Sequence, residues 1–583
     1  MLILFCAPLF VGLNGWDLHN DESIYSYAVD RIVETGEWLT PRAIPLDGPF
    51  LEKPPLKFWI VAAGIRSGLL PHDEIGLRFF DALFGSIAFV YVFLFGRWIG
   101  GVGCGFVSVL MLFTIDSLLF EHGLRSNNME GALFLAYCGG MYHFARWVEM
   151  EGRPKAHAIA VGAFFALGFM TKFVAVFFMP LAAVAALLWR RDGWRQWFSR
   201  WRDWIVPAAL VLLACAPWFV YQTVVGGNRV WREMFGVHVY ERFTAALDPG
   251  HLAPWYYYFY WTWDEVTFAN SEWMAVAGLL MLAVKAWTGH PWAARLILLW
   301  FVLPYALISM TTSKVFHYAF PFFPPMAIGA GWLAVTAFRV LDRWLERGIE
   351  KAEAASGFRV PALPIPVTLS RVLFAGALVM LGVAIWTDAT GPLRLEIGGV
   401  ELRNSSIRRA TLIGLMLLAL AGMPAIRRVA AMAAVAFFLP VATYALQAEH
   451  TMSLGRPLQV LRDCAKSAPE SQRETGVYVP YERLRNHMFF YYPRQIGPWR
   501  ARNDVDYEDL GRRLYESGQQ TLVMMPRADY EAFAVKTGRR TPGLGLSDDV
   551  ILLTPGPFAV CGGAALAAGG TDIGGVFHAR TRH

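Results

Sequence analysis

Charged residues are scarce in this chain of 583 residues: Asp, Glu, Lys and Arg together make up 17%, whereas hydrophobic residues make up 56%. Soluble proteins average about 25% charged and about 45–50% apolar residues, so this composition excludes an ordinary soluble protein. The sequence also lacks a Walker A motif and a Gly-x-Gly-x-x-Gly loop, the usual binding motifs for soluble nucleotides. We therefore expect a polytopic membrane protein that does not use a soluble nucleotide as its donor.

Cysteine is rare, and no His/Cys spacing is typical of a metal site. We expect no cofactor to be required; nothing in the sequence demands a metal, and metal dependence is left open. Four of the six cysteines lie in or beside apolar segments and are expected in the core: Cys6, Cys104, Cys138 and Cys215. The other two, Cys464 and Cys561, can pair only in an oxidising compartment, and the sequence does not favour that disulfide.

Thirteen apolar stretches are candidates to cross a membrane, for which a helix needs about 20 residues. They run over 1–16, 78–99, 103–120, 129–147, 157–170, 173–189, 205–224, 272–288, 293–310, 318–338, 371–388, 409–425 and 429–447. The stretches 157–170 and 173–189 are short, so they form either two spans or one broken segment. The first stretch is also short, which favours a first span trimmed by a misassigned start codon.

The net charge of +6 comes from short basic runs between the apolar stretches, a pattern that orients membrane helices and does not suggest nucleic acid. The main runs lie in 146–155, 190–202, 339–371 and 427–428. With the N-terminus inside and thirteen spans, all four runs are cytoplasmic. The same assignment places these segments outside: 17–77, 121–128, 225–271, 311–317, 389–408 and everything after 447.

The sequence therefore predicts a transmembrane domain over 1–449, with two long outer loops at 17–77 and 225–271. A small extracytoplasmic α/β domain is expected over 450–558, and a disordered tail rich in Gly and Ala over 559–583. Within the α/β domain the local patterns predict strands at 476–479 and 521–525 and helices at 506–517 and 527–537.

The first outer loop begins with the acidic group Asp21-Glu22-x-x-Tyr25. A carboxylate beside a membrane surface has the chemistry of a general base. Alternatively, Asn20 or Asp21 caps a helix that runs through Tyr25 to Val33, although capping accounts for only one of the two acids.

The same loop later contains Glu52-Lys53-Pro54-Pro55. The two prolines favour an extended backbone and hold Lys53 in place. An ammonium there is suited to a lipid phosphate, and the alternative is a lysine that snorkels to the interface. The neighbouring prolines and acids favour the phosphate site.

Three later segments add polar candidates near predicted outer ends of spans. Glu130 opens a span, where it either favours the positive helix N-terminus or lines a polar cavity. Arg242, in the second long loop before His251, has the geometry to bind a phosphate through two hydrogen bonds. The segment from Ser313 to Pro325 brings Lys314, His317 and Tyr318 to a turn, and its prolines either open a groove for a lipid chain or only kink a helix.

In their order and spacing these segments resemble the ArnT-like and protein-mannosyltransferase-like glycosyltransferases of the GT-C class. The resemblance also rests on further matches, at Gly36-x-Trp38-x-x-Pro41, Arg78-Phe79, Arg125 to Glu130, Thr171-Lys172, Pro217-Trp218, His238 to Phe243 and His251-x-x-Pro254. It implies a sugar donor on a polyprenyl phosphate, no further cofactor, and transfer at the outer face of the bacterial inner membrane. It also implies thirteen spans and an extracytoplasmic C-terminal domain.

Carried over by position, the resemblance makes Asp21 the candidate base and Glu22 its acidic neighbour. Lys53, Arg242 and Tyr318 would hold the donor phosphate. Glu130 stands where the family usually has an Asp, so the charge is kept on a longer side chain. The supporting residues are Tyr25, Glu52, Lys172, His251, Lys314 and His317.

The expected reaction is a single displacement that inverts the anomeric centre, because the sequence offers no separate protein nucleophile for retention. The acceptor, whether lipid A, another glycan, a lipid or a protein, is left open. The rival interpretations are a transporter or flippase, a ligase that uses a polyprenyl diphosphate glycan, and a non-enzymatic scaffold. No internal repeat of the kind expected of a transporter is evident.

Overall fold

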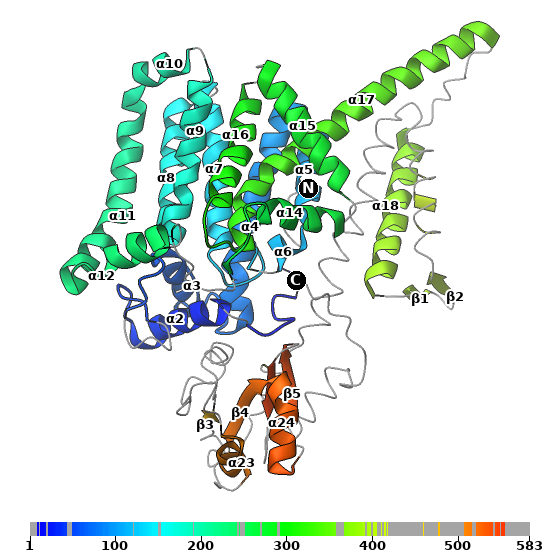
Figure 1. Cartoon of the computed structure of the whole chain (residues 1–583). Helices are drawn as coiled ribbons and strands as arrows, with labels where there is room; N and C mark the ends of the chain where they lie inside the picture. The colour runs from blue at the N-terminus through cyan, green and yellow to red at the C-terminus, as the bar shows by residue number, and fades with distance from the viewer. Residues whose placement is uncertain are drawn as a thin grey trace.

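The computed structural model describes, apart from short gaps, residues 9–356 and 367–404. Of the remaining chain it describes mainly 476–478, 506–515, 521–539, 543–547 and 550–553. The described chain forms a body of long helices beside α2, with a small sheet-containing unit below them in Figure 1. Among the described residues, four helical stretches are long and apolar enough to cross a membrane: Glu74–Gly100, Pro154–Leu188, Trp201–Gly226 and Phe316–Ala337.

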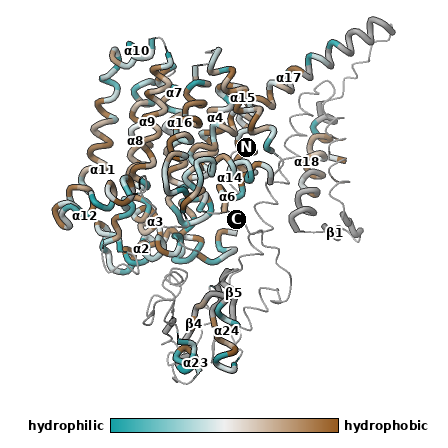
Figure 2. Tube along the Cα trace, in the orientation of Figure 1, coloured by the Kyte–Doolittle hydropathy of each residue, from teal (hydrophilic) through white to brown (hydrophobic). Residues whose placement is uncertain are grey.

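Most helices of the membrane part follow the predicted apolar stretches. Two differ: the predicted span 103–120 is broken after Phe113, and the helix predicted over 318–338 begins at Phe323 and continues to Ser356. The helices are α4 (Glu74–Gly100), α5 (Val102–Phe113), α6 (Asp116–Leu119), α7 (Glu130–Val148), α8 (Pro154–Lys172), α9 (Phe178–Leu188), α11 (Ile205–Gly226), α15 (Glu272–Thr288), α16 (Ala293–Ser309), α17 (Phe323–Ser356) and α18 (Val367–Thr390). Hydrophobic residues dominate along α8 and α11, and hydrophilic residues gather around α2 (Figure 2). The predicted spans 1–16, 409–425 and 429–447 lie mostly or wholly outside the described residues.

The stretch from α8 to α9 makes two passes. Lys172 at the end of α8 contacts Glu130 at the start of α7. Gln196, just beyond α9, donates a hydrogen bond to the carbonyl of Val148 at the end of α7 (2.7 Å). Because the two contacts reach opposite ends of the same helix, α8 and α9 each run along α7. The 3₁₀ turn η1 (Phe173–Phe177) joins them, and Phe173 at its start has a positive φ of 32°.

Close helix packing depends on glycine where α15 crosses α17. A Cβ atom on Gly278 would lie 2.4 Å from the backbone nitrogen of Ala330, and one on Gly329 would lie 2.7 Å from the carbonyl oxygen of Gly278. Small residues let helix backbones approach in this way, which compensates for the weak hydrophobic driving force within a lipid bilayer.

The first outer loop is folded. It contains α2 (Asp21–Thr35) and α3 (Leu56–Arg66), which pack on each other. The predicted helix through Tyr25 is therefore confirmed, with Asp21 as its first residue, while Asn20 lies outside the described residues. Buried apolar side chains from both helices, such as Ile32 and Phe58, hold this loop.

Shorter elements connect the spans. They are α10 (Gly193–Ser199), η2 (Trp201–Trp204), α12 (Arg229–Trp231), the π-helix η3 (Arg232–Glu241), α14 (Tyr257–Phe268) and the 3₁₀ helix η5 (Phe316–Phe322). An isolated antiparallel β-bridge between Leu252 and Ser313 joins the second outer loop to the turn before η5.

The C-terminal part adds two sheets. An antiparallel hairpin, β1 (Leu393–Ile397) and β2 (Val400–Asn404), occupies the segment 389–408, which we expected outside the membrane without predicting strands there. The second sheet has the order β3-β4-β6-β5, with β3 parallel to β4 and the other pairs antiparallel. Its elements are β3 (Gly476–Tyr478), α23 (Tyr507–Tyr515), β4 (Thr521–Pro526), α24 (Arg527–Thr537), β5 (Gly543–Ser547) and β6 (Val550–Leu553).

The elements β3, α23, β4 and α24 agree with the local predictions, whereas β5 and β6 were not predicted. The sheet is mixed. Gln459 ties the beginning of this region to the first loop: its backbone nitrogen donates to Asp17 Oδ1 (3.1 Å) and its Nε2 donates to the carbonyl of Trp16 (2.8 Å). Cys104, Cys138 and Cys215 are free and buried, as predicted, whereas Cys6, Cys464 and Cys561 lie outside the described residues.

Candidate functional site

The two acids at the start of α2 have different environments. Asp21 is half-buried and accepts a hydrogen bond from the hydroxyl of Tyr25 (3.4 Å). Glu22 is only 3% exposed, and its carboxylate is bound by Arg78 of α4 through Nε (2.5 Å) and Nη2 (2.8 Å). The backbone nitrogen of Asn127 also donates to Glu22 (2.8 Å). Glu22 is thus part of the framework that supports α2, and Asp21 is the acid beside Tyr25.

Arg78 organises the entry to α2. Besides Glu22, its guanidinium donates to the carbonyl oxygens of Leu13 (2.6 Å), Trp16 (2.9 Å) and Asp17 (2.9 Å). It is fully buried and lies over the ring of Trp16 at 4.5 Å. A planar guanidinium with five donors is suited to such a junction, because it satisfies several acceptors at fixed angles.

A second buried ion pair supports the same loop. Lys57 of α3 lies 2.7 Å from Asp81 of α4, and its Nζ donates to Asn127 Oδ1 (2.6 Å). Asn127 in turn donates from Nδ2 to Ser26 Oγ of α2 (2.9 Å). The sequence signal for this pair is the presence of an acid within an apolar helix, which usually faces the protein interior. The partner lysine has no comparable signal.

A cavity of about 130 Å³ lies between the first loop, η1, η3 and η5. Its polar lining includes five residues singled out in the sequence: Glu52, Lys53, Lys172, His317 and Tyr318. Its apolar lining includes Leu133, Phe173, Phe178, Met234, Ile308 and Phe322. A small number of charged groups on a mostly apolar wall fits an amphipathic ligand such as a lipid phosphate.

Glu130 lies at the edge of this cavity. It is buried and contacts Lys172 of α8, while His317 Nε2 of η5 lies 3.5 Å from its Oε1. The ammonium of Lys172 also lies over the ring of Tyr318 at 5.1 Å. His122, whose φ is positive at 57°, stacks on His317 with ring centroids 4.7 Å apart. The longer acid at position 130 is therefore held by two cationic or titratable side chains.

The electrostatic environment of Tyr25 shows that several of the predicted acidic residues lie near one another. Its pKa is raised well above the usual value, first by burial and then by the negative charges of Asp21, Glu130 and Glu52. Because such effects require proximity, carboxylates from α2, α7 and the Lys-Pro-Pro segment share one region. Tyr25 therefore stays a neutral hydroxyl beside Asp21.

Three other predicted residues lie elsewhere or cannot be placed. Lys314 is buried and donates from Nζ to the carbonyls of Thr311 (2.5 Å) and Ala253 (2.9 Å), and burial lowers its pKa. The carbonyl of His251 accepts a hydrogen bond from the Lys314 backbone nitrogen (2.9 Å). These contacts make the segment a support for η5. Arg242 lies outside the described residues.

No group of three or more His, Cys, Asp and Glu side chains in the described part of the chain is arranged to hold a metal ion. The described site is composed instead of two lysines, acids, a histidine and tyrosines around a small cavity.

Comparisons with known proteins agree with this arrangement. Residues 52–221 match the family model described as dolichyl-phosphate-mannose-protein mannosyltransferase. An undecaprenyl phosphate-alpha-4-amino-4-deoxy-L-arabinose arabinosyl transferase of Pseudomonas aeruginosa is 27% identical over 379 residues, covering 60% of this chain and 61% of the relative. The crystal structure of ArnT from Cupriavidus metallidurans bound to undecaprenyl phosphate superposes with a TM-score of 0.63, 18% identity and coverage of 94% and 97% of the two chains. The chain is therefore similar to the ArnT-like glycosyltransferases in both sequence and fold.

The likeness to the ArnT crystal structure shows that the chain has the GT-C membrane fold. A second curated relative, arabinosyl transferase 2 of Pseudomonas fluorescens, is 24% identical over 322 residues, covering 53% of this chain and 54% of the relative. The chain thus spans between about half and three fifths of the length of these curated relatives. The matched family model includes Lys53, Glu130 and Lys172 but ends before Tyr318.

Proposed function

We propose that this protein is an integral-membrane glycosyltransferase that moves one sugar from a polyprenyl phosphate to an extracytoplasmic acceptor. The observation that carries the proposal is the cavity where Lys53, Lys172 and Tyr318 lie beside a cluster of acids. Its combination of cationic groups and apolar wall fits a phosphate on a lipid chain. The names of the ArnT-like relatives, which include undecaprenyl phosphate, support this donor class.

In the proposed reaction Lys53 binds the donor phosphate and stabilises the charge that develops on it as the sugar leaves. Tyr318 supplies a hydroxyl at the same wall, and Lys172 a second ammonium near it. Arg242 is proposed as a further phosphate ligand on the basis of the family resemblance. Fixed donors in a site with little water stabilise such an anion more strongly than the same groups in bulk solvent.

Asp21 is the proposed general base. It is half-buried, and its hydrogen bond with Tyr25 orients the carboxylate. The acceptor hydroxyl, or an acceptor phosphate, loses its proton to Asp21 and attacks the anomeric carbon. The bond from that carbon to the phosphate oxygen breaks on the opposite face, and the electron pair leaves with the polyprenyl phosphate. Glu130, which contacts Lys172 and His317, has the proposed role of orienting the sugar.

The proposed cellular setting is the bacterial inner membrane, with the cavity open to the periplasmic side. The transmembrane domain 1–449 carries the site, and the α/β region 450–558 is proposed to lie outside beside the first loop. The hydrogen bonds of Gln459 to Trp16 and Asp17 support that placement. Lipid A, another glycan, a lipid or a protein is the acceptor class to be tested.

The direct test uses purified full-length protein with a panel of undecaprenyl monophosphate sugars, including 4-amino-4-deoxy-L-arabinose and mannose. We expect release of undecaprenyl phosphate together with a glycosylated acceptor of inverted anomeric configuration. A product of retained configuration would defeat the single displacement.

The same assay separates the rival functions. A flippase would move the lipid across a vesicle membrane without breaking the sugar–phosphate bond. A glycan ligase would use a polyprenyl diphosphate donor and leave the monophosphate donors untouched. Either result would overturn the proposal.

A further inference from the structure

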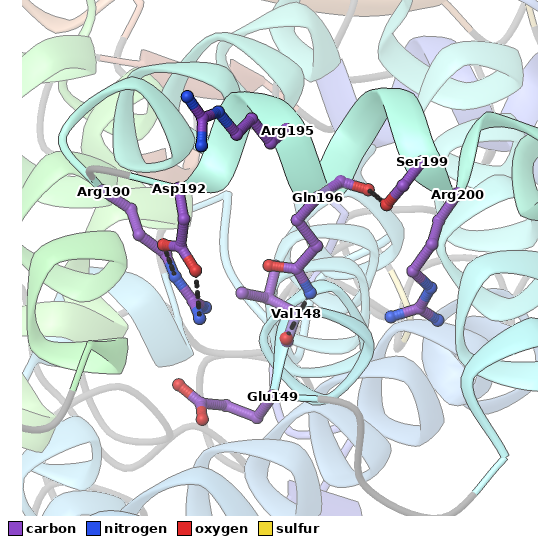
Figure 3. A pocket seen from close by; sticks show the side chains of 8 residues that line it. All are labelled: Val148, Glu149, Arg190, Asp192, Arg195, Gln196, Ser199 and Arg200. Carbon is purple, nitrogen blue, oxygen red and sulfur yellow. Dashed lines mark hydrogen bonds and ion pairs between the residues drawn. The ribbon is translucent and has the colours of Figure 1, made fainter.

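A second pocket lies at the other end of α7, far from the cavity described above. It has a volume of about 490 Å³ and is lined by the end of α7 and by the segment after α9 (Figure 3). The helix α7 has 19 residues between Glu130 and Val148, which corresponds to about 28 Å at 1.5 Å per residue. This length is close to the hydrocarbon thickness of a bilayer, about 30 Å. The pocket therefore lies at the opposite membrane surface.

The helix α10 is fixed over this pocket by contacts to α7. Gln196 donates to the carbonyl of Val148 (2.7 Å), and Arg200, just after α10, donates to the carbonyl of Trp147 (3.2 Å). Arg200 also lies over the Trp147 ring at 4.7 Å. The pocket thus has defined walls, formed by α10 and the α7 terminus (Figure 3).

Two of the three arginines that line the pocket already have acidic partners. Arg190 Nε lies 2.7 Å from Asp192 Oδ1, and this bond holds the pKa of Asp192 below its usual range. Arg200 Nη2 lies 2.9 Å from Asp203 Oδ2. Within each pair the positive and negative charges largely cancel. The two pairs therefore add hydrogen-bond donors to the pocket but little net charge.

The remaining two charged side chains of the lining are Arg195 and Glu149. Within the described part of the chain, neither side chain has a hydrogen-bond or ion-pair partner. Arg195 projects from α10, whereas Glu149 lies across the pocket at the end of α7 (Figure 3). The pocket therefore offers one guanidinium and one carboxylate, on different walls.

The outer face of α10 is suited to a lipid surface. Trp194 and Phe198 lie one turn apart, are 51% and 58% exposed, and have ring centroids 5.1 Å from each other. Arg195, Gln196 and Ser199 of the same helix face the pocket. A short helix with exposed aromatic side chains on one face and polar side chains on the other is typical of the membrane interface.

We propose that this pocket binds the headgroup of a glycerophospholipid that carries both a phosphate and a primary ammonium, as in phosphatidylethanolamine. Arg195 receives the phosphate, with Arg190 and Arg200 as further donors, and Glu149 receives the ammonium. The acyl chains then follow the apolar surface beside Trp194 and Phe198. No bond is made or broken, and the lipid acts as a clamp between α7 and α10.

The chemistry of the lining discriminates between headgroups. Phosphatidylglycerol has a phosphate but no cation, so it leaves Glu149 unpaired and close to a second negative charge. Phosphatidylcholine has a cation without N–H donors, so it cannot make a charge-assisted hydrogen bond to the carboxylate. Phosphatidylethanolamine alone among these three satisfies both side chains.

The test measures lipid retention by native mass spectrometry of the full-length protein, titrated with each of the three lipids in the same detergent. We expect the protein to retain phosphatidylethanolamine about tenfold more tightly than the other two, since a hydrogen bond between charged groups is worth this factor. Glu149→Gln should remove that preference while phosphate-dependent binding persists. Arg195→Gln should weaken all three lipids.

Arg202→Gln is the matched control, because Arg202 is an exposed arginine near the same membrane surface that does not line the pocket. It should leave retention and selectivity unchanged. Gel filtration and thermal unfolding confirm that each variant is folded, which is expected because Glu149 and Arg195 are exposed. Three results would overturn the proposal. The first is equal retention of the three lipids, and the second is a preference for phosphatidylethanolamine that survives Glu149→Gln. The third is an equal loss of lipid retention in Arg195→Gln and Arg202→Gln.

Discussion

The adjacent acids Asp21 and Glu22 should respond in opposite ways to the same conservative change. Glu22 accepts hydrogen bonds from Arg78 Nε (2.5 Å), Arg78 Nη2 (2.8 Å) and the Asn127 backbone (2.8 Å), and it is buried. Glu22→Gln keeps the shape but removes the charge and turns an amide NH₂ group toward a donor. Breaking a buried ion pair on one side costs about 3–5 kcal/mol.

Asp21→Asn should cost much less stability. The carboxylate is half-buried, its hydrogen bond with Tyr25 is long at 3.4 Å, and its charge contributes as an acid at a helix N-terminus. Such a charge is worth about 0.3–1 kcal/mol. If Asp21 is the general base, however, Asp21→Asn should lower the rate of sugar transfer about 10²–10⁴-fold.

The assay pairs thermal unfolding of each purified variant with transfer per folded molecule from an undecaprenyl phosphate sugar. We expect a clear fall in Tm for Glu22→Gln with transfer retained in the folded fraction, and an unchanged Tm with lost transfer for Asp21→Asn. Arg78→Met should lower the stability much as Glu22→Gln does. The double variant should lose less stability than the sum of the two single losses, because both substitutions remove the same interaction. A fully stable Glu22→Gln protein without activity, or a fully active Asp21→Asn protein, would refute this division of roles.

Other predictions concern the phosphate site, the first loop and helix packing. Lys53→Ala should abolish transfer at normal expression and unchanged Tm, and near-wild-type transfer would remove Lys53 from the site. His72 Nε2 lies 2.7 Å from Asp30 Oδ1, a bond that raises the His72 pKa. The His72–Asp30 bond should therefore stabilise the fold at about pH 6, below the ordinary histidine pKa of about 6.5. This stabilisation should disappear as the pH rises through the raised pKa of His72. The Tm difference between wild type and His72→Gln, a half-exposed site worth less than about 1 kcal/mol, should shrink between pH 6 and pH 8.5, and a constant difference would contradict this. Gly278→Ala should lower stability by about 1–3 kcal/mol in thermal unfolding, because its Cβ would meet the α17 backbone at 2.4 Å. Gly382→Ala, with no described atom within 4 Å, should be neutral or slightly stabilising, because Ala has the higher helix propensity, and equal effects of the two substitutions would argue against the close packing.

Local signals in the sequence were sufficient for the helices and for part of the site. The α2 helix follows from its acidic start and its apolar spacing. Most of the apolar stretches that the structure describes are helices near the expected bounds, although 103–120 is interrupted and α17 runs on to Ser356. Lys53, Lys172 and Tyr318 were singled out from separate segments, and the fold brings them to one cavity. Lys53 is conspicuous in the sequence because of its neighbouring prolines and acids, whereas Lys172 and Tyr318 were singled out through the family resemblance.

Pairing between distant segments could not be predicted in the same way. Nothing local tells which cation meets Glu22, and the partner, Arg78, is 56 positions away. The same holds for Lys57 and Asp81, because either could pair with several groups of opposite charge. The sequence therefore identified Glu22 as a catalytic candidate, whereas its contacts indicate a supporting role.

The hairpin β1–β2 is a different case, because its signal is present in the sequence although no strand was predicted there. Leu393–Ile397 and Val400–Asn404 alternate apolar and charged residues on either side of a Gly-Gly pair. This alternation with a glycine turn is typical of two antiparallel strands.

The hydrogen bonds of Gln459 have a consequence for how the chain is divided in experiments. A shortened chain that stops before position 459 also loses two bonds to the segment that leads into α2, which carries Asp21. Truncation would thus disturb the beginning of the chain while leaving its sequence intact. An inactive truncated protein would be poor evidence that the C-terminal region handles substrate, unless Gln459→Ala, which removes the side-chain bond to Trp16, is measured alongside it in the intact chain.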